Sequence, residues 1–234
     1  MADLRLYSAR ACPFAHRTRL VLAEKNQPFD LIEVDLANKP AWFKDVSLYT
    51  KVPALEHDGR HIVESAVVNE YLDEVFPEPR LLPEQPLARA VARIWIDYAN
   101  TRLAPAFGRV LRGASEAERE AGRRELGDVL RFVEREALAK LSASGPYWFG
   151  SDPSLVDFTF YPWFERLPAL QQHSGFTLPS ELDRVLRWHD ALQARPSVRA
   201  IANTTQFYVE RYRSYSPAPA TAPVASTAPQ ARPS

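Results

Sequence analysis

The sequence predicts a two-part fold, in which a small mixed α/β domain precedes an all-helical domain. Three observations lead to this prediction. Residues 4–76 alternate between period-two and helical patterns, the segments after residue 87 keep helical spacing of apolar residues, and four prolines lie between residues 76 and 86. We therefore predict an α/β domain at residues 1–80, a linker at 81–86 and a helical domain at 87–213.

The first domain is expected to contain a small mixed sheet. Leu4 and Leu6 flank Arg5 in a short strand, and Pro13 at the first turn begins a helix that runs to Asn26. The remaining elements are a strand at 29–36, a short helix at 41–45, a hairpin over 52–64 that turns at Asp58-Gly59, and a helix at 65–76. The order β-α-β-α-β-β-α predicts helices on both faces and parallel strands in the first βαβ unit.

The second domain is expected to be entirely helical. Apolar residues recur at three- and four-residue spacing in five segments, at 87–107, 115–141, 154–170, 179–194 and 197–215. Two of these segments begin with a capping box, Ser115 with Glu118 and Ser154 with Asp157. Residues 214–234 hold five prolines and six alanines without an apolar cluster, so we predict a disordered tail there.

Charge and composition restrict the function classes. The 29 Lys+Arg balance the 29 Asp+Glu, so no excess of positive charge indicates nucleic acid or an anionic membrane as a partner. No stretch reaches the roughly 18 consecutive apolar residues that a membrane span needs. The first residues lack the apolar core of a secretory signal, and a lone cysteine cannot form an internal disulfide, so we expect a cytoplasmic location.

Cys12, the single cysteine, is the first candidate for chemistry. If Pro13 is the first helical residue, Cys12 is the N-cap, and its sulfur faces unpaired backbone N–H groups at the positive end of the helix dipole. That position favours the nucleophilic thiolate. Ala15 stands where a C-x-x-C motif would place a second cysteine, so an oxidised Cys12 would need an external thiol. The alternative is a small buried apolar residue, but the position between a strand and a helix favours a reactive thiol.

Five segments occur in the order of a known family: YSARACPFAHRTRLVL, NKPAWFKD, KVPALEHDG, ESAVVNEYLDEVFPEPRLLPEQP and SLVDFTFYPWFERL. They resemble the cysteine-type glutathione transferases of the omega and lambda classes, over residues 4–212. The resemblance implies a thioredoxin-like N-terminal domain that binds glutathione and a helical domain that supplies most of the acceptor pocket. It also implies that Cys12 forms a mixed disulfide with glutathione, and that the chain could form a homodimer.

The resemblance implies a glutathione contact for each of five further residues. Lys39 would pair with the glycyl carboxylate. Val52, which precedes a cis-proline at Pro53, would offer its backbone to the cysteinyl part, and Glu64 and Ser65 would bind the γ-glutamyl end. The residue types fit, because glutathione carries two carboxylates and one ammonium. One departure is that DVSLYTKVP lacks the proline and glycine that many relatives carry shortly before Val-Pro.

The acceptor pocket is expected to be aromatic, with Phe14, Trp163 and Phe164 as its candidates. The leading function is a glutathione-dependent thiol transferase or reductase, which acts on mixed disulfides, dehydroascorbate-like oxidants or glutathione conjugates. One alternative is glutathione conjugation with Tyr7 or Ser8 as the hydroxyl, and another is a non-catalytic binding protein of the same fold. No metal is expected, because no pair of histidines shares a helix face and no metal-binding motif occurs.

Overall fold

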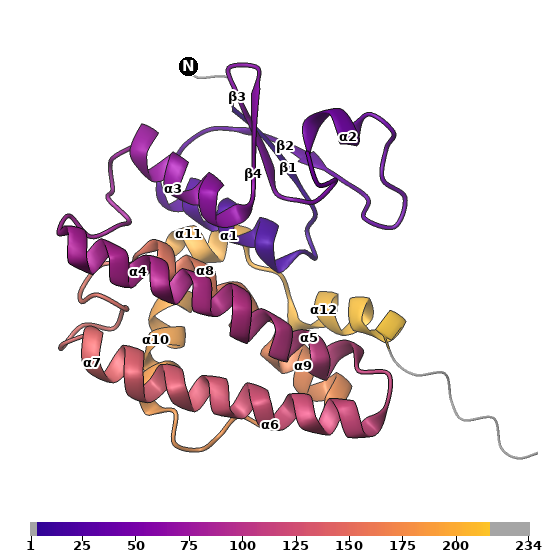
Figure 1. Cartoon of the computed structure of the whole chain (residues 1–234), viewed down its shortest axis with the longest axis vertical. Helices are drawn as coiled ribbons and strands as arrows, with labels where there is room; N and C mark the ends of the chain where they lie inside the picture. Colours follow the sequence, from indigo (N-terminus) through magenta and orange to yellow (C-terminus); the bar gives the residue numbers. More distant parts are fainter. Residues whose placement is uncertain (1–3, 216–234) are drawn as a thin grey trace, which may run out of the picture.

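The computed structural model describes residues 4–215, which form a four-stranded sheet and a set of helices below it (Figure 1). The strand order is β2-β1-β3-β4. Strand β1 (Leu4–Ser8) is parallel to β2 (Asp30–Glu33) and antiparallel to β3 (Ala54–His57), which pairs with β4 (Arg60–Val63). The predicted mixed sheet with a parallel first pair is confirmed.

Helices cover both faces of this sheet, and their bounds are α1 (Pro13–Glu24), α2 (Phe43–Val46) and α3 (Ser65–Val75). Because successive residues of a strand point to opposite faces, each strand contributes to two cores. Leu6 and Leu55 are buried in the large core with α1 and α3, whereas Tyr7 and Ala54 belong to a smaller core with Phe43 of α2. The predicted arrangement of helices on both faces is therefore present.

The second part of the described chain is helical, as predicted. Its elements are α4 (Pro86–Tyr98), the π-helix η1 (Ala99–Leu103), α5 (Ala104–Arg112), α6 (Glu116–Phe132), the π-helix η2 (Val133–Leu138), α7 (Ala139–Leu141), α8 (Leu155–Glu165), α9 (Leu167–Ser174), α10 (Asp183–Gln193), α11 (Pro196–Ile201), α12 (Thr205–Tyr212) and the 3₁₀ turn η3 (Arg213–Tyr215). In Figure 1, α11 lies beside α1 and α12 lies near α9, and the segment between α11 and α12 reaches the loop before α1, where Asn203 accepts from Arg10. The helices of this half therefore reach the N-terminal end of α1.

Several boundaries differ from the sequence prediction by a few residues, and three differences lie in the last third of the chain. The segment 154–170 divides into α8 and α9 at Arg166, and Pro168, which lacks a backbone N–H, stands in the first turn of α9. The segment 197–215 divides into α11 and α12 because the backbone at Ala202 is extended and not helical. Tyr215, assigned to the tail, belongs to η3, where its ring contacts that of Tyr212. The rest of the predicted tail lies outside the described residues.

Only one of the two predicted capping boxes has both reciprocal bonds. Ser154 and Asp157 form the full box at the start of α8. At the start of α6, Ser115 accepts from the Glu118 N–H, but the Glu118 carboxylate accepts from the N–H of Ala114 instead of Ser115. The α8 box is the buried one of the two, and it fixes the start of the helix that carries Trp163.

A buried ion pair holds the proline-rich segment between the two halves. Lys25 Nζ lies 2.8 Å from an oxygen of Asp73 and also donates to the carbonyls of Phe76 and Pro79. The same carboxylate accepts from the N–H groups of Leu81 and Leu82. These bonds fasten the segment to α1 and α3, and the division into domains at residues 80 and 87 stays a prediction.

Candidate active site

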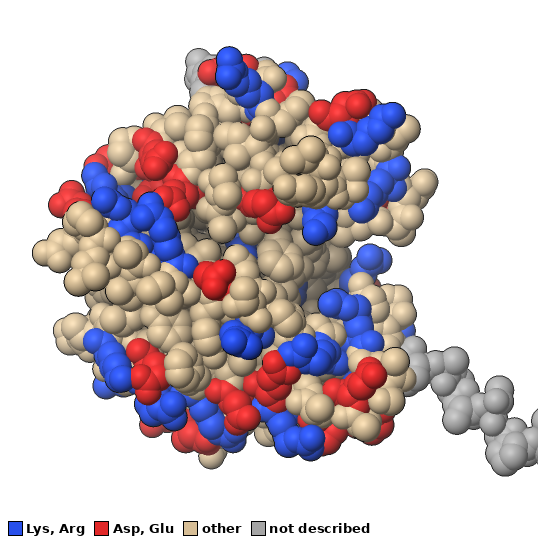
Figure 2. Space-filling model, in the orientation of Figure 1, with Lys and Arg blue, Asp and Glu red and all other residues tan. Residues whose placement is uncertain are grey.

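Two cavities lie between the sheet and the helices, and both reach the start of α1. The larger has a volume of about 440 Å³ and the smaller about 140 Å³. Phe14 lines both, Cys12 lines the larger, and Val52 lines the smaller. Figure 2 shows the surface hollowed at its right edge, between the half with the sheet and the half with α12. A molecule that bridges the two cavities would pass the Cys12 sulfur.

Cys12 occupies the position that the sequence predicts, the N-cap of α1. Its backbone is extended, with φ −77° and ψ 121°, and its side chain makes no capping hydrogen bond. The first N–H groups of α1 are therefore not capped by this residue. The sulfur lies 3.8 Å from the carbonyl oxygen of Val52, and the side chain is half-buried. The thiol thus stands at a positive helix end and faces the loop before Pro53.

A buried arginine from the helical half holds the loop before Cys12. Arg166, whose side chain is 1% exposed, donates 3.1 Å to the carbonyl oxygen of Ala11 and 2.6 Å to that of Pro162. It also contacts His16. Burial, together with the charges of Arg166 and Arg19, holds the pKa of His16 well below its usual range. His16 is therefore neutral at pH 7, and the loop is positioned by α8.

A second buried arginine, Arg17 of α1, connects the elements around the smaller cavity. It donates to Thr159 O at 3.0 Å, Asn100 Oδ1 at 2.6 Å and Ser65 Oγ at 3.4 Å. Burial lowers the pKa of Arg17 to about 9, and the charge of an ionised Cys12 opposes this shift. Because this pKa lies above 7, the guanidinium stays charged at pH 7. A fixed cation therefore lies beneath Ser65, one of the residues predicted to bind glutathione.

The start of α3 forms one wall of the smaller cavity. Glu64 is its N-cap, with φ 68° and ψ 114°, and makes no side-chain capping bond. A non-glycine residue in this region of positive φ costs on the order of 1–3 kcal/mol, and such residues cluster at ligand sites. Ser65 begins the helix and lines the same cavity. The two predicted γ-glutamyl contacts thus stand at an uncapped helix N-terminus.

The loop on the opposite wall carries the cis peptide bond predicted between Val52 and Pro53. Both residues line the smaller cavity, together with Lys51. Lys39 does not line it: its ammonium donates 2.9 Å to the carbonyl oxygen of Thr50. In the described structure the Lys39 ammonium stabilises the loop while Lys51 reaches the cavity wall, and the pairing of Lys39 with the glycyl carboxylate stays a prediction.

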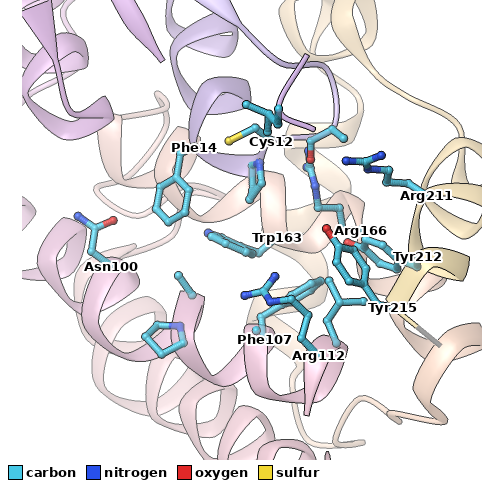
Figure 3. Close-up of a pocket in the computed structure, with 17 residues that line it drawn as sticks. Cys12, Phe14, Asn100, Phe107, Arg112, Trp163, Arg166, Arg211, Tyr212 and Tyr215 are labelled. Atoms are coloured by element: carbon cyan, nitrogen blue, oxygen red, sulfur yellow. The ribbon is translucent and has the colours of Figure 1, made fainter. Parts of the chain in front are cut away.

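Two of the three aromatic candidates line the larger cavity. The rings of Phe14 and Trp163 meet edge-on, with their centroids 5.4 Å apart, and Figure 3 shows them below the Cys12 sulfur. Phe164 does not line it, and its ring packs 4.7 Å from that of Trp188 on α10. Phe164 thus lies in the core in the described structure, and its contact with an acceptor stays a prediction. Consecutive residues of a helix point about 100° apart, so Trp163 faces the cavity and Phe164 the core.

Sequence reasoning missed several residues of the larger cavity. The far wall is formed by α5, α12 and η3, through the side chains of Phe107, Arg112, Arg211, Tyr212 and Tyr215. No local pattern indicates them, because their positions depend on the packing of segments about 100 and 200 residues from Cys12. Asn100 and Arg166 were missed for the same reason, and Tyr215 was assigned to the tail.

The two hydroxyls considered as alternatives to Cys12 have other partners. Tyr7 donates 2.7 Å to Glu56, and burial together with this carboxylate raises the pKa of Tyr7. Ser8 is fully buried and accepts 2.6 Å from Arg19. Neither residue lines either cavity.

Residues 4–215 contain neither a candidate membrane span nor a candidate metal site. None of the helices there is both long and apolar enough to cross a bilayer. Within the same range, no three side chains of His, Cys, Asp or Glu are grouped so that they could hold a metal ion.

Two family models match the chain: Glutathione S-transferase, N-terminal domain, at residues 11–75, and Glutathione S-transferase, C-terminal domain, at 101–191. Glutathione S-transferase omega-1 of Sus scrofa is 35% identical over 199 residues, which cover 85% of this chain and 80% of that protein. The crystal structure of glutathione transferase Omega 3C from Trametes versicolor has a TM-score of 0.80 at 29% identity, covering 91% of this chain and 90% of that one. Rice GST1 in complex with glutathione has a TM-score of 0.81 at 28% identity, covering 91% and 96%.

Proposed function

This chain belongs to the glutathione S-transferase family and resembles its omega class, and on that premise we propose that it is a glutathione-dependent thiol transferase that acts through Cys12. Glutathione would occupy the smaller cavity, with its γ-glutamyl end at Glu64 and Ser65 and its cysteinyl part along Val52. The acceptor would occupy the larger cavity beside Phe14 and Trp163.

The reaction takes two exchange steps. In the first, the Cys12 thiolate attacks the glutathione sulfur of a mixed disulfide or conjugate, a Cys12–glutathione disulfide forms, and the other half leaves as a thiolate or, from a ketone conjugate, as an enolate that takes up a proton. In the second, a glutathione thiolate attacks the glutathione sulfur of this disulfide and frees Cys12. Oxidised glutathione is the second product, so electrons balance without any further reductant.

One observation carries the proposal: the Cys12 sulfur stands at an uncapped helix N-terminus, Cys12 lines the larger cavity, and the sulfur lies 3.8 Å from the carbonyl oxygen of Val52, which lines the smaller. A buried structural cysteine would have no need of such a position. The matches to omega-class proteins support the same function, because the omega class is one of the cysteine-type classes that the sequence resembles.

The direct test is the intact mass of the protein after incubation with oxidised glutathione. We expect one glutathione to be added, to be lost on treatment with a reductant, and to be absent in Cys12→Ser. Because Cys12 is the single cysteine of the chain, the adduct has one possible site. The absence of an adduct on the native protein would overturn the proposal and favour the alternative of a non-catalytic binding protein.

The strained backbone of Glu64 gives a separate prediction about glutathione binding. We expect Glu64→Gly to weaken glutathione binding about tenfold by loss of a charge-assisted contact, and to raise the free energy of unfolding by up to about 1 kcal/mol by relief of the positive φ. Isothermal calorimetry and urea denaturation measure the two effects. Glu64→Gln is the matched control, because it keeps the strain and removes only the charge. Wild-type affinity in both variants would exclude Glu64 from the site.

Conjugation by Tyr7 or Ser8 is the weaker candidate function. Tyr7 is engaged with Glu56 and Ser8 with Arg19, so neither hydroxyl is directed at a cavity in the described structure. Conjugation would therefore depend on Cys12 or on backbone groups to stabilise the thiolate of glutathione.

A cytoplasmic location and a homodimer stay predictions. Exposed apolar side chains on α3 and α4, namely Val67, Leu87 and Ile94, suit an interface between two copies of the chain. Sedimentation velocity would measure the oligomeric state. No partner among nucleic acids or membranes is proposed, in line with the balanced charge.

A further inference from the structure

The acceptor cavity is both aromatic and positively charged. Five rings line it, from Phe14, Phe107, Trp163, Tyr212 and Tyr215, and so do three guanidinium groups. No Asp or Glu is among the described residues that line it. The chain as a whole carries equal numbers of basic and acidic residues, so this local excess of charge is not a property of the composition.

The arginines of the cavity lack the carboxylate partners that several arginines elsewhere in the described chain have. Arg109, one turn before Arg112 on α5, pairs with Glu125, and Arg93 pairs with Glu70. Within residues 4–215, by contrast, neither Arg112 nor Arg211 forms an ion pair; the guanidinium of Arg112 lies 5.9 Å from the ring centroid of Tyr215. Two charges at the cavity mouth are therefore free to bind an anion.

The third arginine adds charge deeper in the cavity. Arg166 is buried, and its Nε has no hydrogen-bond partner among the described residues, although its other nitrogens bind Ala11 and Pro162. The charges of Arg166 and Arg112 act to lower the pKa of Tyr212, but burial dominates and raises it to about 12. The hydroxyl of Tyr212 is therefore neutral at pH 7, and the cavity wall that it belongs to has a positive potential. Figure 3 shows Arg211 and Arg166 on the side of Tyr212, and Arg112 below Trp163.

We propose that the larger cavity selects acceptors that consist of an aromatic ring and an anionic group, and that Arg112 and Arg211 determine this preference. This inference rests on the proposed function. The substrates are then glutathione mixed disulfides or conjugates whose other half is an aromatic carboxylate. The ring packs on Trp163 and Phe107, and the carboxylate binds a guanidinium group at the mouth, that of Arg112 in one orientation of the ring and that of Arg211 in another. A volume of about 440 Å³ accommodates such a group.

The test compares binding of 2-naphthoate with that of its neutral amide, 2-naphthamide, by calorimetry. Saturating S-methylglutathione fills the glutathione site without exchanging, so the probe can enter only the remaining cavity. We expect the native protein to bind the carboxylate at least about tenfold more tightly, and added salt to reduce this ratio because both arginines are exposed. Arg112→Gln and Arg211→Gln should each lower the ratio about threefold, whereas the control Arg109→Gln, on the same helix, should leave it unchanged.

Kinetics separate this inference from the proposed function. The mixed disulfide of glutathione with 5-thio-2-nitrobenzoate and the corresponding benzamide differ only in the charge, and each releases a coloured thiolate. The inference is supported if the kcat/KM for the carboxylate disulfide, divided by that for the amide disulfide, changes across the variants in the same way as the ratio of the two probe affinities. Equal binding of the two probes by the native protein, or a ratio that neither arginine variant changes, overturns it. A binding preference without Cys12-dependent turnover of either disulfide would support the anion-selective cavity and overturn thiol transfer.

Discussion

Cys12→Ser is expected to lower the rate of glutathione-dependent disulfide reduction by more than about 10³-fold. A serine hydroxyl at this N-cap cannot form a disulfide with glutathione, so the first exchange step has no acceptor. The other groups of the site stay in place, because the Cys12 side chain makes no capping bond that serine would lose. Steady-state reduction of a glutathione mixed disulfide, coupled to glutathione reductase, measures the effect.

The same variant should keep the glutathione site. We expect its affinity for S-methylglutathione to lie within about threefold of the native value, because Glu64, Ser65 and Val52 are unchanged. Glutathione conjugation to 1-chloro-2,4-dinitrobenzene should rise, since a serine hydroxyl can donate a hydrogen bond to a glutathione thiolate. Retention of full thiol transfer in Cys12→Ser would show that another group performs the exchange.

Asp157→Ala is expected to lower the free energy of unfolding by about 4 kcal/mol or more. The carboxylate is fully buried at the start of α8 and accepts from four groups: the N–H groups of Trp148 and Ser154, the hydroxyl of Ser154 and the indole of Trp188. Alanine would leave these donors without this acceptor, and the capping box of the helix that carries Trp163 would lose its Asp157 half, while Ser154 would still accept from the Val156 N–H. Urea denaturation followed by tryptophan fluorescence is the measurement, because Trp148 and Trp188, two of the five tryptophans, lie at the altered site.

Asp152→Ala is the matched control for that experiment. Asp152 lies in the loop before α8, is exposed, and accepts only from the neighbouring Ser151 hydroxyl. Its replacement should change the free energy of unfolding by no more than about 0.5 kcal/mol. If Asp157→Ala costs less than about 1 kcal/mol, the capping box does not stabilise this part of the fold as described.

The pH dependence of stability should also change at Asp157. Burial raises the pKa of Asp157 to about 6, although its hydrogen bonds act to lower it. An unfolded aspartate titrates near pH 4, so between about pH 4 and 6 the native state binds more protons than the unfolded state. The contribution of this group to stability therefore decreases as pH rises through that range. The decrease should be absent in Asp157→Ala, measured by the same denaturation at several pH values.

Residues close together in the sequence were the part of the site that could be predicted. Pro13 at the first turn fixes where α1 begins, and that alone makes Cys12 the N-cap. The spacing of Ser154 and Asp157 likewise specifies a capping box, because both partners lie within one turn of helix. Alternation of Leu4, Arg5 and Leu6 predicted the strand β1, but the burial of Tyr7 and Ser8 on the same strand did not follow from it, because helices cover both faces of the sheet.

What only the tertiary structure decided is which side chains surround Cys12. A lysine at 39 and a lysine at 51 are equivalent to a sequence pattern, but the fold of the loop directs only Lys51 to the cavity wall. The arginines of the acceptor cavity stand on α5, α8 and α12, and Arg166 reaches a carbonyl 155 residues away in the chain. Such contacts follow from how helices pack on one another, which depends on the whole core, whereas strands, caps and helix starts follow from a few neighbouring residues.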